Sequence, residues 1–207
     1  SMVDARLYLP KDWCDDPARC EEAGIPKENR GFKTKLDLAV DIIHQQVENG
    51  ISFDFIGADG YYGNEVNFAS KIEELGYLYM VDVHSDQSMY LERPELIVPE
   101  RKSNRGRTPT KLQATIEDIN VSEYLKTLQT NDWQTLKVRN TAKGKLVGNY
   151  HFAKVFVWNR STNQIEPRTL VIRKIRSGKK RVEIKYSFTN AHFGQYTPEA
   201  LAYMQAQ

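Results

Sequence analysis

Residues 53–65, FDFIGADGYYGNE, place an aspartate at the end of an apolar run and follow it with a turn that contains two glycines. The apolar run predicts a strand, so Asp59 would lie at its carboxyl end, where ligands bind in parallel α/β sheets. A carboxylate there can hold a divalent metal ion, because such ions prefer oxygen ligands, and Gly60 and Gly63 would let a metal or a phosphate come close.

Asp59 also fits structural roles, as the cap of the next helix or as a solvated turn residue. A phosphoacceptor aspartate of the receiver type is a further alternative. The acidic pair usually found earlier in such domains is, however, missing from any obvious strand end.

The elements around Asp59 predict an α/β arrangement. The segment KTKLDLAVDIIHQQVENG predicts a helix with one apolar face that ends at Asn49 and Gly50, and a second helix spans 65–75. Strands are expected over 3–9, 53–58 and 77–83, with an irregular connection over 11–33. This order favours right-handed crossovers and a partly parallel sheet.

The second half of the chain predicts β structure. Residues 84–120 contain three prolines and a basic cluster, which favours an extended connection, and a short helix is expected over 121–128. Four strands are then expected, in WQTLKVRN, NYHFAKVFVWN, RTLVIRKI and RVEIKYSFTN. Thr197, Pro198 and Glu199 predict the start of a final helix, with Glu199 complementing the dipole of its first turn.

Charge is divided unequally along the chain, although the net charge is only +2. Residues 1–100 carry 9 Lys and Arg against 20 Asp and Glu (9 − 20 = −11), whereas residues 101–207 carry 20 against 7 (20 − 7 = +13). Such asymmetry indicates two surfaces with different partners, of which the basic one favours a polyanion such as nucleic acid.

Composition favours a soluble, cytoplasmic protein. No apolar stretch approaches the ~20 residues of a membrane helix, and no basic-then-apolar leader opens the chain, so no membrane partner is expected. The two cysteines, Cys14 and Cys20, match no common zinc pattern and make no disulfide scaffold. The four histidines, which also lack ligand spacing, are expected to be structural: His44, His84, His151 and His192.

The sequence resembles DDE-type insertion-sequence transposases. Four segments carry the resemblance in the same order and at similar spacing: VDARLYLPKDWCDDPARCEEAGIP, KTKLDLAVDIIHQQVENGISFDFIGADGYYGN, NRGRTPTKL and DWQTLKVRNTAKGKL. The nearest group is the cut-and-paste branch, whose ribonuclease-H-like catalytic core is interrupted by a β-rich insertion. The resemblance runs over most of the chain and is firmest over residues 3–63.

The resemblance implies a role for Asp59. In that family an ADxxYG stretch follows the fourth core strand, and its aspartate is the second acid of the metal-binding DDE triad; here Asp59, Tyr62 and Gly63 match it. Two carboxylate-held Mg²⁺ (or Mn²⁺) ions about 3.5 to 4 Å apart can activate the nucleophile and stabilise the leaving oxygen of a phosphodiester. One aspartate cannot hold both ions.

The resemblance further implies that this chain lacks both ends of the core. The family's first Asp would lie upstream and its Glu downstream, since Glu199 lacks the preceding Arg-aromatic pair. We therefore expect a partial catalytic core that is inactive alone, within an enzyme that acts in the bacterial nucleoid as a homodimer on transposon ends and target DNA. An upstream strand ending in Asp and a downstream Arg-aromatic-x-x-Glu helix in the parent gene would favour this over a non-catalytic module.

That alternative, a nucleic-acid-binding module, would use the basic half. Candidate DNA-binding residues are Arg101, Lys102, Arg105, Arg107, Lys143 and Lys145, with a further basic stretch over 173–185. Trp133, Tyr150 and Trp158 could stack on unpaired bases. The competing interpretations are a solvated face of a half-buried sheet for the cations and core packing for the aromatics.

The predicted fold class is thus α/β, a partial ribonuclease-H-like core with an antiparallel β-rich insertion domain. Residues 1–86 would form the partial core, 87–190 the linker and insertion, and 191–207 the start of the C-terminal core helix. We expect the β portion to be separate from the core, and the edge of the strand over 3–9 to be exposed.

Overall fold

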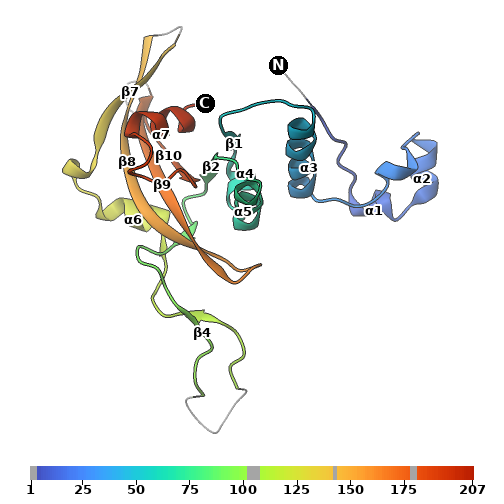
Figure 1. The fold of residues 1–207 in the computed structure, drawn as a ribbon, viewed down its shortest axis with the longest axis horizontal. Helices are drawn as coiled ribbons and strands as arrows, with labels where there is room; N and C mark the ends of the chain where they lie inside the picture. Colours follow the sequence, from blue (N-terminus) through green and yellow to red (C-terminus); the bar gives the residue numbers. More distant parts are fainter. Residues whose placement is uncertain (1–3, 102–107, 142–143, 178–180) are drawn as a thin grey trace. The chain divides into compact units, whose positions relative to one another are not determined.

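The chain folds into two compact units, Ser1–Asp54 and Phe55–Gln207, in a computed structural model that describes residues 4–101, 108–141, 144–177 and 181–207. The units are coloured from blue to red along the chain in Figure 1. The two units meet at one boundary, between residues 54 and 55. The predicted division into three domains, with boundaries after residues 86 and 190, stays a prediction.

The first unit is helical. Its small core contains Leu9, Cys20 and Ile25. The predicted helix that ends at Asn49 is confirmed, and it begins with a capping box in which Thr34 and Asp37 satisfy each other's backbone N–H groups. Its elements are α1 (Lys11–Cys14), α2 (Pro17–Glu22), η1 (Lys27–Asn29) and α3 (Lys35–Glu48).

The strand predicted over 3–9 is not formed in residues 4–9. A strand needs a neighbour to pair with its backbone N–H and C=O groups, and no described segment pairs with this one. The Asp4 carboxylate instead accepts hydrogen bonds from the Ala5 N–H and from Gln46 of α3. The predicted exposed edge is therefore not found there.

The second unit is built on a six-stranded sheet in the order β1-β2-β10-β9-β8-β7, with β1 and β7 at its edges. β1 and β2 are parallel and every other neighbouring pair is antiparallel. The strands are β1 (Ile56–Ala58), β2 (Tyr79–Val83), β7 (Gln134–Thr141), β8 (Gly144–Asn159), β9 (Gln164–Ser177) and β10 (Arg181–Thr189), and the helical segments are α4 (Gly60–Gly63), α5 (Val66–Glu74), α6 (Val121–Thr127), η2 (Thr130–Asp132) and α7 (Pro198–Gln205).

The long antiparallel strands do not form the separate sheet that we expected. β10 pairs with β2, with Ser187 opposite Asp82 and Phe188 opposite Val81, so the predicted insertion continues the sheet of the α/β part. The physical reason is that β1 pairs with only one edge of β2, so the other edge is free to pair with β10. In this sheet Val81 and Phe188 are both buried.

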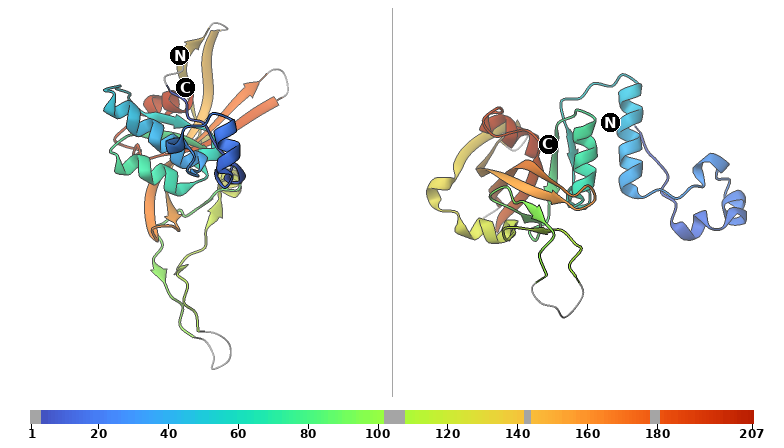
Figure 2. Two further views of the ribbon diagram at one scale, coloured as in Figure 1. Left: turned by 90° about the vertical axis from the view of Figure 1, so that its right-hand side faces the viewer. Right: turned by 60° about the horizontal axis from the view of Figure 1, so that its bottom comes forward.

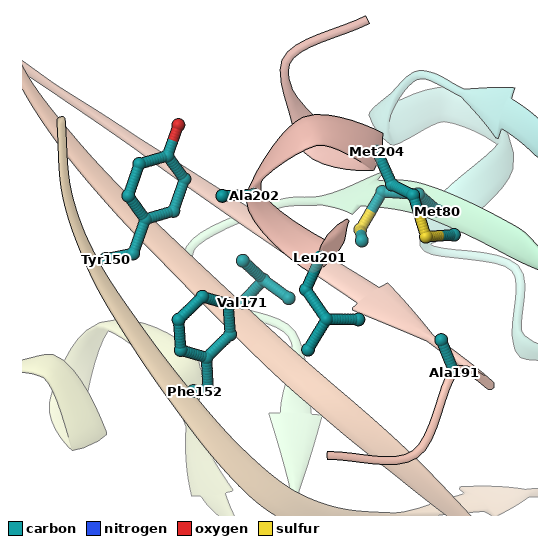
Figure 3. Close-up of a cluster of buried hydrophobic side chains, with 8 residues drawn as sticks. All are labelled: Met80, Tyr150, Phe152, Val171, Ala191, Leu201, Ala202 and Met204. Carbon is teal, nitrogen blue, oxygen red and sulfur yellow. The ribbon is translucent and has the colours of Figure 1, made fainter. Parts of the chain in front are cut away.

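Different helices cover the two faces of this sheet. On one face Tyr150 and Phe152 of β8 pack with Leu201 and Ala202 of α7 (Figure 3). On the other, α5 contributes the buried Ile72 and contacts β2 and β8. The buried positions of β8 accordingly change phase along the strand, from 150 and 152 to 155, 157 and 159. Two-sided coverage explains why the alternation is not continuous.

The stretch predicted as an extended connection forms two short antiparallel pairs. β3 (Ser88–Met89) pairs with β6 (Ile119–Asn120), and β4 (Leu96–Ile97) pairs with β5 (Gln113–Ala114). The β4–β5 pair projects from the body of the second unit as an arm (Figures 1 and 2).

The helices are short throughout the described residues. The longest of them, α3, has 14 residues. No described helix has both the length and the apolar character needed to cross a membrane.

Candidate functional site

Asp59 lies directly after β1, as predicted, and its carboxylate caps α4. Its Oδ1 accepts a hydrogen bond from the Tyr61 N–H at 3.0 Å. The capping interpretation therefore describes a real contact. That contact engages one carboxylate oxygen, and among the described residues no donor is found for Oδ2. The side chain is exposed, so a cap and a ligand role are compatible.

A cavity of about 270 Å³ adjoins Asp59. It also contains Asp82 of β2, because Ala58 pairs with Val81 in the parallel register and the next residue of each strand continues side by side. The cavity is lined by Phe55, Gly57, Ala58, Asp59, Met80, Asp82, Lys185, Met204, Gln205 and Gln207.

Asp82 differs from Asp59 because both of its oxygens are engaged. Oδ1 accepts a hydrogen bond from the Ser187 hydroxyl at 2.8 Å, and Oδ2 lies 2.8 Å from the Lys185 ammonium nitrogen. Ser187 in turn accepts from the Gln205 amide nitrogen at 2.9 Å, which also donates to the Val171 carbonyl at 3.0 Å. A row of polar contacts thus joins β2 to α7 across the sheet.

Sequence reasoning missed Asp82, Ser187 and Gln205. The one available signal was an acid inside the otherwise apolar strand YMVDV, for which we predicted a strand and no role for the acid. Ser187 and Gln205 gave no signal, because their importance follows from strand pairing and helix docking between residues distant in sequence.

Gly63 holds α4 tightly against β2. A Cβ placed at Gly63 would lie 1.9 Å from the carbonyl oxygen of Asp82, well inside van der Waals contact. The glycine is therefore required by packing between helix and strand, and through that packing it fixes the turn that carries Asp59. We had predicted instead that it lets a ligand approach.

We expect Gly63→Ala to lower the free energy of unfolding by about 1 to 3 kcal/mol, because α4 must move away from a backbone atom that cannot yield. Urea unfolding followed by circular dichroism would measure it. Gly57→Ala is the matched control, since a Cβ there meets no atom within 4 Å. Equal losses in both variants would contradict the packing argument.

The predicted DNA-binding residues are only partly described. Arg101, which follows β4 in the arm, and Lys145 of β8 are exposed. Four others lie outside the described residues: Lys102, Arg105, Arg107 and Lys143. In the stretch 173–185, Arg173 lies 3.9 Å from Glu183, and Lys185 lines the Asp59 cavity. The described cations therefore lie in the arm and on β8, β9 and β10 of the second unit.

The three candidate stacking aromatics differ in environment. Tyr150 is fully buried in the core, which confirms core packing for this residue. Trp158 is half-buried, and its indole nitrogen is buried without a partner among the described residues. Trp133 lines a separate cavity with Asn149 and Lys174, whose ammonium nitrogen lies 3.8 Å from the centre of the indole ring. Trp158 also has a cation beside its ring, because the guanidinium carbon of Arg160 lies 4.3 Å from the ring centre and both residues line another cavity.

Comparison with known families shows which family the chain belongs to. A family described as DDE superfamily endonuclease matches residues 1–145, more than half of the chain and including Asp59. The chain belongs to this family. The resemblance to a DDE transposase is thereby confirmed. Among curated proteins, none matches the chain.

Membership of the DDE endonuclease family implies DNA as the substrate and a general use of divalent metal ions. The oxygen donors of the Asp59 cavity suit such an ion, because Mg²⁺ is typically bound by one or two carboxylates and keeps several waters. Within residues that the structure describes, no group of three Asp, Glu, His or Cys is close enough to enclose a metal. The cavity therefore fits a partial, one-carboxylate site.

Proposed function

We propose that this chain is the central part of a DDE transposase, a ribonuclease-H-like core with a β-rich insertion, and that Asp59 is the second acid of its metal-binding triad. The observation that supports this is the position of Asp59 at the carboxyl end of a strand in the parallel pair. One of its oxygens caps a helix, and no donor to the other is found in the described part of the chain.

Two residues of the chain, Asp59 and Gly63, would determine where the metal binds. Asp59 contributes a carboxylate oxygen whose direction is fixed by the cap on Tyr61. Gly63 keeps this turn against β2. Asp59 would hold Mg²⁺ or Mn²⁺, which when bound would supply activation of a water or hydroxyl nucleophile and stabilisation of the leaving oxygen of the phosphodiester. Strand transfer on transposon ends by a homodimer remains part of the proposal.

Metal binding tests the role of Asp59. We expect the chain to bind Mn²⁺ weakly and Asp59→Asn to reduce that affinity at least about tenfold, because loss of even an outer partner of a metal ligand commonly costs 10-fold or more. Electron paramagnetic resonance of free Mn²⁺ would measure both. Glu117→Gln, which removes the same charge from an exposed residue outside the cavity, is the control.

An unchanged Mn²⁺ affinity in Asp59→Asn would contradict the metal role and leave the capping role alone. Cutting of DNA by this chain that Asp59→Asn abolished would confirm Asp59 and show that the remaining ligands lie within residues 1–207.

The second candidate function is non-catalytic nucleic-acid binding by the basic half. The observation that favours it is the cavity of about 490 Å³ in which Trp133 and Lys174 lie together with polar side chains. An aromatic ring beside a cation suits an unpaired base and its phosphate. This binding surface is compatible with the transposase proposal, since the enzyme must also hold DNA.

A further inference from the structure

The Asp59 cavity has an unfavourable charge for its proposed substrate. Two carboxylates, Asp59 and Asp82, line it, and a DNA phosphate would be repelled by both. Among the described residues that line the cavity, Lys185 is the one cation. It lies on β10, two residues before Ser187, the cross-strand partner of Asp82.

Lys185 is held in place by an ion pair with Asp82. Its Nζ is 2.8 Å from Oδ2 of Asp82, and the lysine and aspartate side chains keep 32% and 26% of their exposure. Asp82 is held by Ser187, and Ser187 by Gln205, a residue only 2% exposed. The position of the ammonium group thus depends on contacts that reach the buried end of α7.

The ammonium group also keeps donors for a ligand. It has three N–H donors, and the described residues offer it one acceptor, the Asp82 carboxylate. A phosphate oxygen in the cavity could accept from the others without breaking that ion pair. Lysine is suited to this contact as a compact point charge.

Resting on the proposed function, we propose that Lys185 binds a DNA phosphate in the Asp59 cavity and that Asp82 is the residue that positions it. Asp82 is then not a metal ligand, because Ser187 and Lys185 occupy its two oxygens. The two carboxylates of the cavity then have different roles: Asp59 would hold the metal, and Asp82 orients the lysine.

The first test is the salt dependence of DNA binding. Anisotropy of a short fluorescein-labelled DNA duplex is measured against salt concentration in Mg²⁺ buffer. We expect Lys185→Met to weaken binding and to reduce the slope of log affinity against log salt by about 0.9, the value for one lost phosphate contact. Lys185→Arg, which keeps the charge, should keep the slope.

Lys126→Met is the matched control. Lys126 is also paired with an acid, Glu123 at 2.7 Å, and its loss removes the same charge from α6, outside the cavity. A slope for Lys185→Met equal to that of Lys126→Met would overturn the proposal. A slope for Lys185→Arg as low as that of Lys185→Met would also overturn it, since charge would then not be the property that matters.

The second test separates Asp82 from Asp59 through Mn²⁺ binding. We expect Asp82→Asn to keep an Mn²⁺ affinity closer to that of the unmodified chain than to that of Asp59→Asn. A loss as large as that of Asp59→Asn would make Asp82 a metal ligand and overturn its positioning role. If Asp59→Asn itself had no effect, the proposed function would fail, whereas the DNA slopes would still decide the role of Lys185.

Discussion

Replacing Arg168 by methionine is expected to lower the free energy of unfolding by about 3 to 5 kcal/mol, the usual cost of removing one partner from a buried ion pair. Arg168 of β9 is 2% exposed and pairs with Glu166 and, at 2.8 Å, with Glu73 of α5. Without the guanidinium group, two carboxylates would face each other with no positive charge between them.

The network around Arg168 joins α5 to the β8–β9 hairpin. Glu166 accepts hydrogen bonds from the Ser70 hydroxyl of α5 and, at 3.0 Å, from the Asn159 amide of β8. Burial raises the pKa of the neighbouring Tyr79 hydroxyl far above its ordinary value, and the Arg168 charge opposes that shift. Tyr79 therefore stays neutral and adds no third negative charge to the two glutamates that pair with Arg168.

Urea unfolding of Arg168→Met and of Lys126→Met compares the loss of a buried ion pair with the loss of an exposed one. Lys126 and Glu123 form an exposed ion pair, with side chains 68% and 55% accessible, and its loss should cost less than about 1 kcal/mol. Adding Glu166→Gln to Arg168→Met should recover part of the stability, because one unpaired charge is removed. Equal costs for the two single variants would show that the buried network contributes no more than a surface pair.

Local patterns predicted most elements of this chain but not their partners. Apolar spacing and end signals such as Asn49, Gly50 and Thr197 predict α3, α5, α6, α7 and the four long strands. The alternation of apolar residues predicts which face of a strand is buried, but it does not predict which strand pairs with it. We therefore predicted a separate β-sheet where β10 in fact pairs with β2.

In the candidate site, too, a residue positioned by its own segment was predicted, whereas residues brought together by the fold were not. Asp59 was predictable because a single segment contains both the strand and the turn that position it. Asp82, Lys185 and Gln205 come together only when β2, β10 and α7 are assembled, and no spacing rule connects positions so far apart. Lys185 was recognised only as part of a basic stretch, without its ion pair to Asp82.

DNA binding by the chain is expected to weaken by on the order of a hundredfold or more between roughly 50 and 200 mM salt. If about 4 to 6 residues of the basic half contact phosphates, each contributes about 0.9 to the slope of log affinity against log salt. The net charge of +13 over residues 101–207 supplies these contacts, and the net charge of −11 over residues 1–100 repels DNA. Binding should also lack sequence preference, because phosphate contacts carry no sequence information.

Charge removal is a sharper test of this surface than deletion, because deleting residues 101–190 would remove β7 to β10 and with them most of the sheet. Neutralising the exposed Lys137, Arg139 and Lys145 to glutamine at the β7–β8 edge should lower both affinity and slope. Asp59→Asn, measured with a metal chelator present, should leave both nearly unchanged. DNA binding that is insensitive to salt, or equal binding by the first unit alone, would contradict this prediction. The cations would then form only the solvent-exposed face of the sheet.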